Sequence, residues 1–447
     1  MILDDLRDRR VAVWGLGQEG MATEALLASR GVVATLIDDR PEAASTRIGG
    51  DRAVVAPGAV DWSTLDVVIR APGVSRYRPE LAAAGAAGVV VTTAMALWLE
   101  DFRGARVVAV TGTKGKSTTA ALAASILRHQ GGEVALIGNI GVPVTDTYDR
   151  PRAEAYVVEV SSFQASDVTV TPGVCVLTSL APDHLDWHGG EEPYYRDKLH
   201  LIEVGPPGAL AVSAASPEAV ARTEGHPHRS LFGPAGLVRV GSSGMVEVDG
   251  DRLVDPARLR APGAHNVWNL CGAIAGVTLL SGAPPSAGAV GAAVDSFDGL
   301  PSRCHTVGRR HGLTFVDDAL ASNPFATVAS VDAFPGRPLT VIVGGADRGV
   351  DVGLLVEAFR HRRPLPTVVA LPPDRDRLVD AFARVPGGPE PKVALLEADD
   401  MEAAVRLAVD STADGGVVLF SPAAPTPEGG GGYGERSRQF IEASGVA

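Results

Sequence analysis

The stretch RVVAVTGTKGKSTTAALAASILRH, residues 106–129, decides the fold of this chain. Its apolar, β-branched first part predicts a buried strand, and its alanine-rich last part predicts a helix. Between them lies a glycine loop that carries Lys116 and Ser117 and opens directly into the helix. A strand, a glycine loop and a helix in this order are the context that a phosphate-binding loop requires. The alternative is a glycine-rich turn that only starts a helix.

In the first interpretation, the backbone N–H groups of residues 112–117 face phosphate oxygens. Lys116 lies against the β and γ phosphates, and the Ser117 hydroxyl holds Mg²⁺. The loop departs from the GxxxxGK[ST] pattern at one position, because Val110 stands where the first glycine is usual.

The same alternation of apolar strands and alanine-rich helices recurs on both sides of this stretch, for example at VVATLIDD (32–39) and PLTVIVGG (338–345). Such an alternation is typical of α/β proteins with parallel sheets covered on both faces. We predict three domains: a Rossmann-like domain at 1–103, a P-loop ATPase-like domain at 104–301 and a second Rossmann-like domain at 302–447. Short alternating strands between about residues 205 and 263 predict a small antiparallel appendage inside the second domain.

Composition excludes several classes of protein. The 447 residues include 40 Lys+Arg and 53 Asp+Glu, a net charge of −13, which argues against a sequence-independent nucleic-acid binder. The cysteines are three and widely spaced, which indicates a reducing compartment. The N-terminus MILDDLRDRR is charged and every alanine-rich run is interrupted, so we expect a cytoplasmic protein without a membrane anchor.

A second glycine loop, VWGLGQEG at 13–20, follows the first predicted strand. Gly15, Gly17 and Gly20 match GxGxxG, and Asp38 ends the next strand about 20 residues later. This pattern fits either NAD or a nucleotide-diphosphate substrate, and we favour the substrate because a second nucleotide loop follows. A tight turn that only packs a helix on a strand is the structural alternative.

Polar residues at the ends of other predicted elements supply candidate metal ligands. They are Asn139 in ALIGNIG, Glu159 in VVEVSSFQ, His184 in APDHLDWHG and Lys198 in YYRDKLH. Each residue alone is more often structural or solvated. Together they can ring a triphosphate, where carboxylate and imidazole groups suit Mg²⁺.

The order of these motifs resembles that of the Mur ligase family over essentially the whole chain. The resemblance rests on TGTKGKSTT, GNIG, EVSSFQ, DHLDWHG, the lysine of YYRDKLH, HNVWN, FDGLPSR and VDDALASNP. Within the family, EVSSFQ, GLPSR and VWGLGQEG are most similar to the branch that adds glutamate to UDP-N-acetylmuramoyl-L-alanine in peptidoglycan precursor synthesis. Folylpolyglutamate synthases share the phosphate loop but lack the first nucleotide-binding unit.

The resemblance implies an ATP-dependent reaction through an acyl phosphate, with two Mg²⁺ ions. One ion would be held by Ser117 and Glu159, and the other by Glu159, His184 and a carbamylated Lys198. Lys116, His184 and Lys198 would be the catalytic residues. The implied chain is a monomer that binds the UDP-sugar substrate, glutamate and ATP.

The resemblance also implies binding residues. For ATP these are Gly112, Thr113, Lys114, Gly115, Lys116, Ser117, Thr118, Asn266, Asn269, Arg303 and Asp318, while His265 either joins them or caps its helix. For the UDP-substrate they are Gly15, Gly17, Gln18, Glu19, Asp38, Arg40 and Asn139.

The region that corresponds to the amino-acid pocket departs from the family pattern. The D-glutamate-adding enzymes carry NDSKATN where this chain has DDALASN at 317–323, so Leu320 replaces a lysine and Ser322 a threonine. Thr426 and Tyr433 stand where the family has a serine and a phenylalanine, and Arg348 is a candidate replacement cation.

These departures, and the tryptophan of VWGLG, favour a related branch that adds L-glutamate before a separate epimerase acts. The ordinary D-glutamate ligase and a non-catalytic Mur-like protein remain the alternatives.

Overall fold

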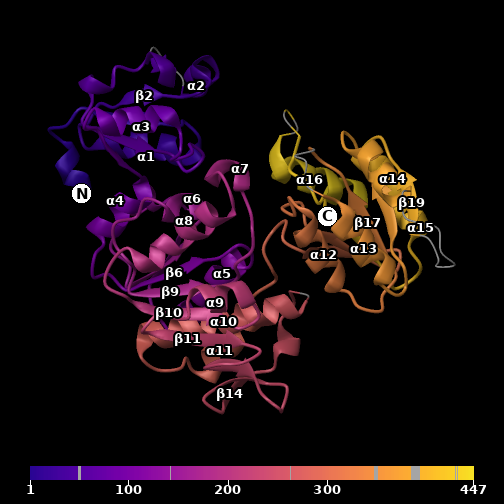
Figure 1. Cartoon of the computed structure of the whole chain (residues 1–447). Coiled ribbons are helices and arrows are strands. Elements are labelled where there is room, and N and C mark those ends of the chain that lie inside the picture. The colour runs from indigo at the N-terminus through magenta and orange to yellow at the C-terminus, as the bar shows by residue number, and fades with distance from the viewer. Residues whose placement is uncertain are drawn as a thin grey trace. The chain divides into compact units, whose positions relative to one another are not determined.

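The computed structural model describes residues 1–48, 52–140, 142–261, 263–346, 351–383, 393–427, 429 and 431–446. Within them the chain forms three β-sheets flanked by helices, which confirms the α/β class (Figure 1). The strands of the three sheets fall inside the three predicted domain ranges, whose functional assignments stay predictions. By its internal contacts the chain divides into two compact units: Met1–Pro256 with Trp268–Ala293, and Ala257–Val267 with Val294–Ala447.

The first sheet has five parallel strands in the order β3-β2-β1-β4-β5. Their bounds are Val54–Val55, Thr35–Ile37, Val11–Trp14, Val67–Arg70 and Val90–Thr92. Successive residues of a strand point to opposite faces. Accordingly Val11 and Val13 pack with α1 (Gln18–Ser29), whereas Ala12 and Trp14 pack with α3 (Pro79–Ala86). Helix α2 (Pro41–Ile48) follows β2.

The central sheet has nine strands in the order β14-β13-β12-β11-β10-β9-β6-β8-β7. In sequence order they are β6 (Val107–Thr111), β7 (Val134–Gly138), β8 (Ala155–Glu159), β9 (Val174–Leu177), β10 (Ala209–Ser213), β11 (Arg229–Gly233), β12 (Val238–Val240), β13 (Val246–Val248) and β14 (Asp251–Val254). The predicted small antiparallel appendage at 205–263 is wrong in its extent. Strands β10 and β11 extend the central sheet in parallel, and only β12, β13 and β14 form antiparallel pairs. The reason is helix α9 (Pro217–Arg222), which makes the crossover that parallel pairing requires.

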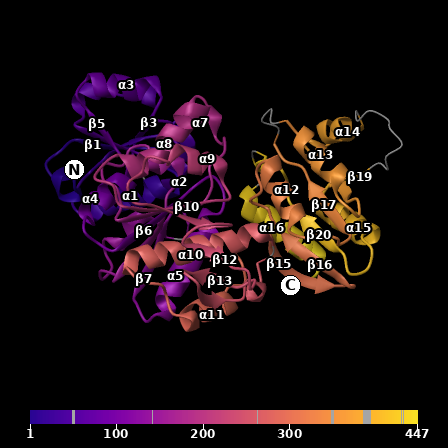
Figure 2. The same cartoon turned by 60° about the horizontal axis from the view of Figure 1, so that its bottom comes forward.

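Helices cover both faces of the central sheet (Figure 2). On one face lie α4 (Ala94–Asp101), α6 (Ser162–Ala165) and α8 (Glu191–Glu203), which contribute Trp98, Tyr194 and Tyr195 to the core. On the other lie α5 (Lys116–His129) and α10 (Ala264–Ser281). A Cβ on Gly276 of α10 would lie 2.8 Å from Val176 Cγ2, so this helix approaches the sheet as closely as a glycine allows.

The third sheet has the order β15-β16-β20-β17-β18-β19, in which only β15 runs antiparallel to its neighbour. The strands are His305–Arg310, Leu313–Asp317, Val417–Phe420, Leu339–Val343, Thr367–Ala370 and Ala394–Glu397. One face packs with α12 (Pro324–Asp332), α13 (Gly353–His361) and α14 (Arg375–Ala383). The other packs with α15 (Met401–Ser411) and α16 (Gly432–Ser444).

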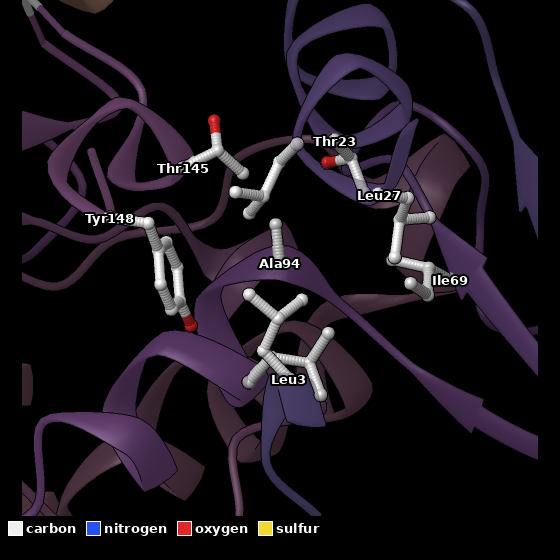
Figure 3. Close-up of a pocket in the computed structure, with 9 residues that line it drawn as sticks. Leu3, Thr23, Leu27, Ile69, Ala94, Thr145 and Tyr148 are labelled. Atoms are coloured by element: carbon white, nitrogen blue, oxygen red, sulfur yellow. The ribbon is translucent and has the colours of Figure 1, made fainter. Parts of the chain in front are cut away.

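The first two sheets meet around a small cavity of about 10 Å³, which Leu3, Thr23, Ile69, Ala94 and Tyr148 help to line (Figure 3). This is about the space that one water molecule occupies. Thr145 also lines it, and its buried hydroxyl has no hydrogen-bond partner within the structure. Next to the cavity, Asp101 Oδ2 accepts hydrogen bonds from the Leu3 N–H (3.0 Å) and the Tyr148 hydroxyl (2.6 Å). The two sheets are therefore joined by close packing and partly buried hydrogen bonds.

Two further features of the fold are the state of the cysteines and the length of the helices. Cys175, Cys271 and Cys304 are free and buried. Burial raises the pKa of Cys175 and of Cys271 to about 12, so both stay thiols at neutral pH. Among the residues described, no helix combines the length and the apolar character that crossing a bilayer requires.

The glycines of the first nucleotide loop have different roles. A Cβ on Gly20 would lie 1.9 Å from the Gly15 carbonyl oxygen, so Gly20 is needed to bring α1 against the loop. Gly15 has a φ of +92°, and a Cβ on it would lie 2.8 Å from Val74 Cγ2. A Cβ on Gly17 would meet no atom within 4 Å. Packing therefore explains Gly15 and Gly20 but does not explain Gly17.

We predict that Gly20→Ala lowers the free energy of unfolding by about 1–3 kcal/mol, because the new methyl group overlaps a backbone oxygen. Gly17→Ala is the matched control and should cost less than about 1 kcal/mol, as the exchange of a glycine at a helix N-cap. Thermal melting of both variants measures the difference. Equal melting temperatures for the two variants would contradict this assignment.

Candidate active site

The phosphate loop connects β6 to α5 and depends on two glycines with left-handed backbone. Gly112 has a φ of +143° and Gly115 a φ of +88°. A Cβ on Gly112 would lie 2.2 Å from Thr178 Oγ1, and one on Gly115 would lie 2.3 Å from Asn269 Oδ1. Both positions therefore exclude any side chain, and the structure brings Asn269 to the loop.

The segment after β9 holds this loop in place through hydrogen bonds. The Thr113 N–H donates to the Ser179 carbonyl (2.9 Å) and the Lys114 N–H donates to Ser179 Oγ (2.8 Å). Thr178 Oγ1 donates to the Lys114 carbonyl (2.6 Å). Two N–H groups of the loop are used in this way. We therefore expect phosphate to bind at the N–H groups of residues 115–118, at the start of α5.

Sequence reasoning missed Thr178 and Ser179. The available signal was a pair of hydroxyl residues directly after β9, which pairs with β6 and so ends at the same edge of the sheet. Side chains at this edge meet the loop after β6.

Two lysines place positive charge around the loop. Lys116 Nζ donates to the carbonyl oxygens of Gly112 and Thr113, both at 3.0 Å, so its ammonium lies within the curve of the loop. Lys114 Nζ lies 3.2 Å from Asp183 Oδ2. Asp183 was also missed by sequence reasoning, although it directly precedes the predicted ligand His184. Burial opposes ionisation of Asp183, but Lys114 and His184 together hold its pKa below the usual value.

Glu159 is the centre of the predicted metal site. It is the last residue of β8 and is fully buried. Its Oε2 accepts a hydrogen bond from Ser117 Oγ at 2.6 Å, and its Oε1 accepts one from Asn139 Nδ2 at 2.8 Å. The structure thus brings together three residues that are 20 and 42 positions apart along the chain.

Lys198 lies in the middle of α8 and not near a helix start as predicted. Its side chain is buried, and its Nζ donates to the Gly112 carbonyl at 2.9 Å. Burial, and then repulsion from Lys116, hold its pKa well below the ordinary value, although Asp183 opposes the shift. This environment favours the neutral amine.

His184 directly precedes the short helix α7 (Leu185–His188) and has left-handed backbone, with a φ of 51°. Its half-exposed ring lies 4.9 Å from the Phe163 ring, centroid to centroid. Burial lowers its pKa, and the carboxylate of Asp183 opposes the shift. Lys116 and Lys198 also lower the pKa of His184, so these three predicted residues share one electrostatic environment.

The residues at this site fit Mg²⁺ in part. Ser117 Oγ and Glu159 Oε2 are hard oxygen donors that already touch, as two ligands of one ion would. Among the described residues, no group of three or more His, Cys, Asp or Glu side chains stands ready to bind a metal. A second ion would therefore need a further anionic oxygen donor, which the predicted carbamate on Lys198 would supply.

The first nucleotide loop is held partly by the chain itself. Asp38 Oδ2 accepts from the Leu16 N–H (2.8 Å) and Oδ1 accepts from the Arg40 N–H (2.9 Å). Gln18 and Arg40 are exposed beside this loop. The predicted contacts of these residues with a nucleotide stay predictions.

Glu19 connects this loop with the central sheet. Its Oε2 accepts from Gln164 Nε2 of α6 at 2.9 Å, while its buried Oε1 has no hydrogen-bond partner within the structure. Burial raises the pKa of Glu19 to about 7, even though the Gln164 hydrogen bond opposes this shift. An unpartnered, buried carboxyl oxygen is suited to accept a hydrogen bond from a ligand.

Asp318, in the second compact unit, is fully used by its own chain. Its Oδ1 accepts from the Cys304 N–H (3.0 Å), and its Oδ2 accepts from the hydroxyls of Ser330 and Ser421, both at 2.7 Å. Burial raises its pKa to about 6. Arg303 is exposed, and its contact with ATP, like that of Asp318, stays a prediction.

The residues predicted to bind the amino acid follow strands that end at the same edge of the third sheet. Leu320 and Ser322 follow β16, and Thr426 follows β20; these two strands are neighbours. Tyr433 is exposed on α16. Arg348 lies outside the described residues.

Three further polar residues belong to the second unit. Arg436 of α16, which sequence reasoning missed, is a buried cation: its Nη2 donates to the Gly344 carbonyl at 2.7 Å, and its Nη1 has no hydrogen-bond partner within the structure. Burial lowers the pKa of Arg436 to about 10. His265 is half-buried near the start of α10, and burial lowers its pKa. Asn266, the next residue, is buried.

This chain is similar to known families and to named relatives. Two family models match, the Mur ligase middle domain over residues 110–277 and the Mur ligase, glutamate ligase domain over residues 302–424. A Micromonospora protein is 40% identical, with 99% of this chain and 98% of the relative covered. A Xanthomonas axonopodis pv. citri protein is 34% identical, with 100% and 97% covered. Both relatives are named UDP-N-acetylmuramoyl-L-alanine–L-glutamate ligase.

Solved structures share the fold at lower identity. UDP-N-acetylmuramate-alanine ligase from Thermotoga maritima has a TM-score of 0.61 at 20% identity, with 97% of this chain and 98% of that chain covered. MurF ligase from the same organism, in complex with ADP, has a TM-score of 0.60 at 17% identity, with 99% and 95% covered. The match to a relative at 40% identity over nearly the full length of both chains decides the assignment: this chain belongs to the Mur ligase family.

Proposed function

We propose that this chain joins glutamate to UDP-N-acetylmuramoyl-L-alanine in an ATP-dependent reaction, as part of peptidoglycan precursor synthesis. The observation that carries the proposal is the Ser117–Glu159–Asn139 cluster at the phosphate loop, with Lys116 and Lys198 beside it. The names of the full-length relatives support the choice of substrates.

The reaction begins when the carboxylate of the UDP-substrate attacks the γ-phosphorus of ATP, which forms an acyl phosphate and releases ADP. The glutamate amine then attacks the acyl carbon, loses a proton, and phosphate leaves. Lys116 and the N–H groups of residues 115–118 would bind and orient the phosphates, which is most of what phosphoryl transfer needs. Bound Mg²⁺ supplies further neutralisation of phosphate charge, and Ser117, Glu159, His184 and carbamylated Lys198 would hold it.

The burial of Lys198 supports its carbamylation. Only a neutral amine reacts with CO₂, and the low pKa of Lys198 favours that form. The neutral amine and CO₂ form a carbamate and release one proton, so a side chain without an anionic oxygen gains one that can bind a metal ion.

The remaining assignments follow the three sheets. Residues 1–103 would bind the UDP-sugar, residues 104–301 ATP, and residues 302–447 glutamate. Gly15, Gly17, Gln18, Glu19, Asp38, Arg40 and Asn139 are the proposed contacts of the UDP-substrate. Leu320, Ser322, Thr426 and Tyr433 are the proposed contacts of glutamate, and Asn266, Asn269, Arg303 and Asp318 those of ATP.

We favour L-glutamate, because Leu320 stands where the D-glutamate-adding enzymes have a lysine and because both named relatives use the L-isomer in their names. An epimerase would then act on the product. We further propose a cytoplasmic monomer.

We expect phosphate release from ATP in the presence of Mg²⁺, UDP-N-acetylmuramoyl-L-alanine and L-glutamate, with the amide product confirmed by mass. D-glutamate should support a much lower rate. Turnover with D-glutamate alone would make the chain an ordinary D-glutamate ligase, and silence with both isomers would favour the non-catalytic alternative. Lys116→Ala supplies the background rate, since it removes the phosphate-binding charge without changing a core residue.

Lys198→Ala should lower kcat by about 100-fold or more, because a metal ligand is lost. Short carboxylic acids such as acetate should restore part of this activity, since they can enter the vacated space and replace the carbamate oxygens. Lys198→Met is the matched control: its side chain fills the space, so we expect no rescue. The carbamate assignment fails if Lys198→Ala retains full activity or if acids rescue neither variant.

A further inference from the structure

A buried network of hydrogen bonds, which the proposed reaction does not use, joins the segments that carry the proposed metal ligands. His188 Nδ1 lies 2.7 Å from Asp197 Oδ2, and His188 Nε2 lies 3.0 Å from Ser162 Oγ. An ionised carboxylate only accepts hydrogen bonds, so the ring donates from Nδ1 to Asp197 and accepts the Ser162 hydroxyl at Nε2. All three side chains are almost completely buried.

The network of Ser162, His188 and Asp197 has the composition of a Ser-His-Asp triad, but its burial argues against a nucleophilic role. Such a serine must reach a substrate carbonyl. Ser162 and His188 are only 3% and 1% exposed, and the imidazole is packed among the rings of Phe163, Trp187 and Tyr194. A structural or positioning role is what remains for this arrangement.

Each member of the network belongs to a segment that carries a proposed metal ligand. Ser162 begins α6, three residues after Glu159. His188 ends α7, the helix that His184 precedes. Asp197 is the neighbour of Lys198 in α8. One imidazole with two hydrogen bonds therefore connects the three segments that bear Glu159, His184 and Lys198.

The same hydrogen-bond network extends to the segment that follows β4 of the first sheet. Tyr77, in the segment between β4 and α3, donates its hydroxyl to Asp197, 3.0 Å from each carboxylate oxygen. Ser75 Oγ donates to the Trp187 carbonyl at 2.7 Å, and Trp187 Nε1 donates to the Pro72 carbonyl at 3.1 Å. The segment 72–77 is thus attached to the same short helix and to the same aspartate.

We propose that His188, with Asp197, is a positioning residue that holds the three metal-ligand segments in register and connects them, through Tyr77, to the domain proposed to bind the UDP-sugar. The inference rests on the proposed function. Residues that orient metal ligands typically contribute 10- to 100-fold to metal affinity or activity. Loss of His188 should therefore weaken Mg²⁺ binding while the phosphate loop and the glutamate site are unchanged.

The test compares four proteins: the unaltered chain, His188→Phe, Tyr77→Phe and His200→Phe. His200 is the matched control, because it lies in the same helix α8 and its Nε2 lies 3.0 Å from the Val168 carbonyl, away from the network. The readout is the Mg²⁺ concentration that half-saturates the rise in melting temperature caused by a non-hydrolysable ATP analogue. The KM for glutamate is measured beside it.

We expect His188→Phe to raise the half-saturating Mg²⁺ concentration about 10- to 100-fold, with the KM for glutamate unchanged. Tyr77→Phe removes a hydroxyl that donates to Asp197 and accepts from Arg196 Nη2, and should raise this concentration roughly 2- to 10-fold. His200→Phe should leave it unchanged. A variant that only loses stability would melt at a lower temperature at every Mg²⁺ concentration, and its half-saturating Mg²⁺ concentration would not change.

The inference is overturned if His188→Phe matches His200→Phe in Mg²⁺ dependence. If His188→Phe does not fold, an unchanged Mg²⁺ dependence in Tyr77→Phe overturns it instead. No Mg²⁺-dependent rise in the unaltered protein would overturn the proposed function itself, and this inference with it.

Discussion

The buried carboxyl group of Glu159 is the constraint on which the rest of the site depends. A carboxylate removed from water is costly unless hydrogen bonds or a cation compensate it. Here Ser117 and Asn139 each donate one hydrogen bond. Ser117 lies at the start of the helix that follows β6 and Asn139 directly follows β7, and these are the two strands beside β8. Parallel pairing of β6, β8 and β7 is what brings these three side chains to one point. The sheet order is thus tied directly to the chemistry.

Beside this carboxyl group the chain places the amino groups of two lysines. Lys116 and Lys198 both donate to the carbonyl of Gly112, and Lys198 is buried. The ammonium forms of the two lysines would repel each other, and after burial this repulsion is a cause of the low pKa of Lys198. A polyphosphate bound at the loop would relieve the repulsion, and a carbamate would reverse the charge of one partner. These groups fit the proposed binding of a polyphosphate and the proposed carbamylation of Lys198.

Much of this arrangement could be predicted from sequence, because strand and helix periodicity, glycine loops and motif order are local properties. They placed the phosphate loop, Glu159 at a strand end and His184 at a helix start. The extent of the antiparallel appendage at 205–263 was wrong because short strands with turn signals do not reveal whether α9 is a crossover helix. Thr178, Ser179, Asp183, His188 and Asp197 were missed because their roles arise only when distant strand ends meet. The amino-acid pocket was the least predictable part, since its residues follow different strands and depart from the family pattern.

The central claim is that Glu159 binds Mg²⁺ and is not merely a buried structural group. Calorimetric titration of a non-hydrolysable ATP analogue, with and without Mg²⁺, tests it in Glu159→Gln. The amide can keep both hydrogen bonds, accepting from Asn139 and donating to Ser117, so the fold should be retained. We predict that Mg²⁺ strengthens nucleotide binding to the unaltered protein but not to the variant, while Mg²⁺-free binding is equal in both. An equal effect of Mg²⁺ on the two proteins would contradict the account.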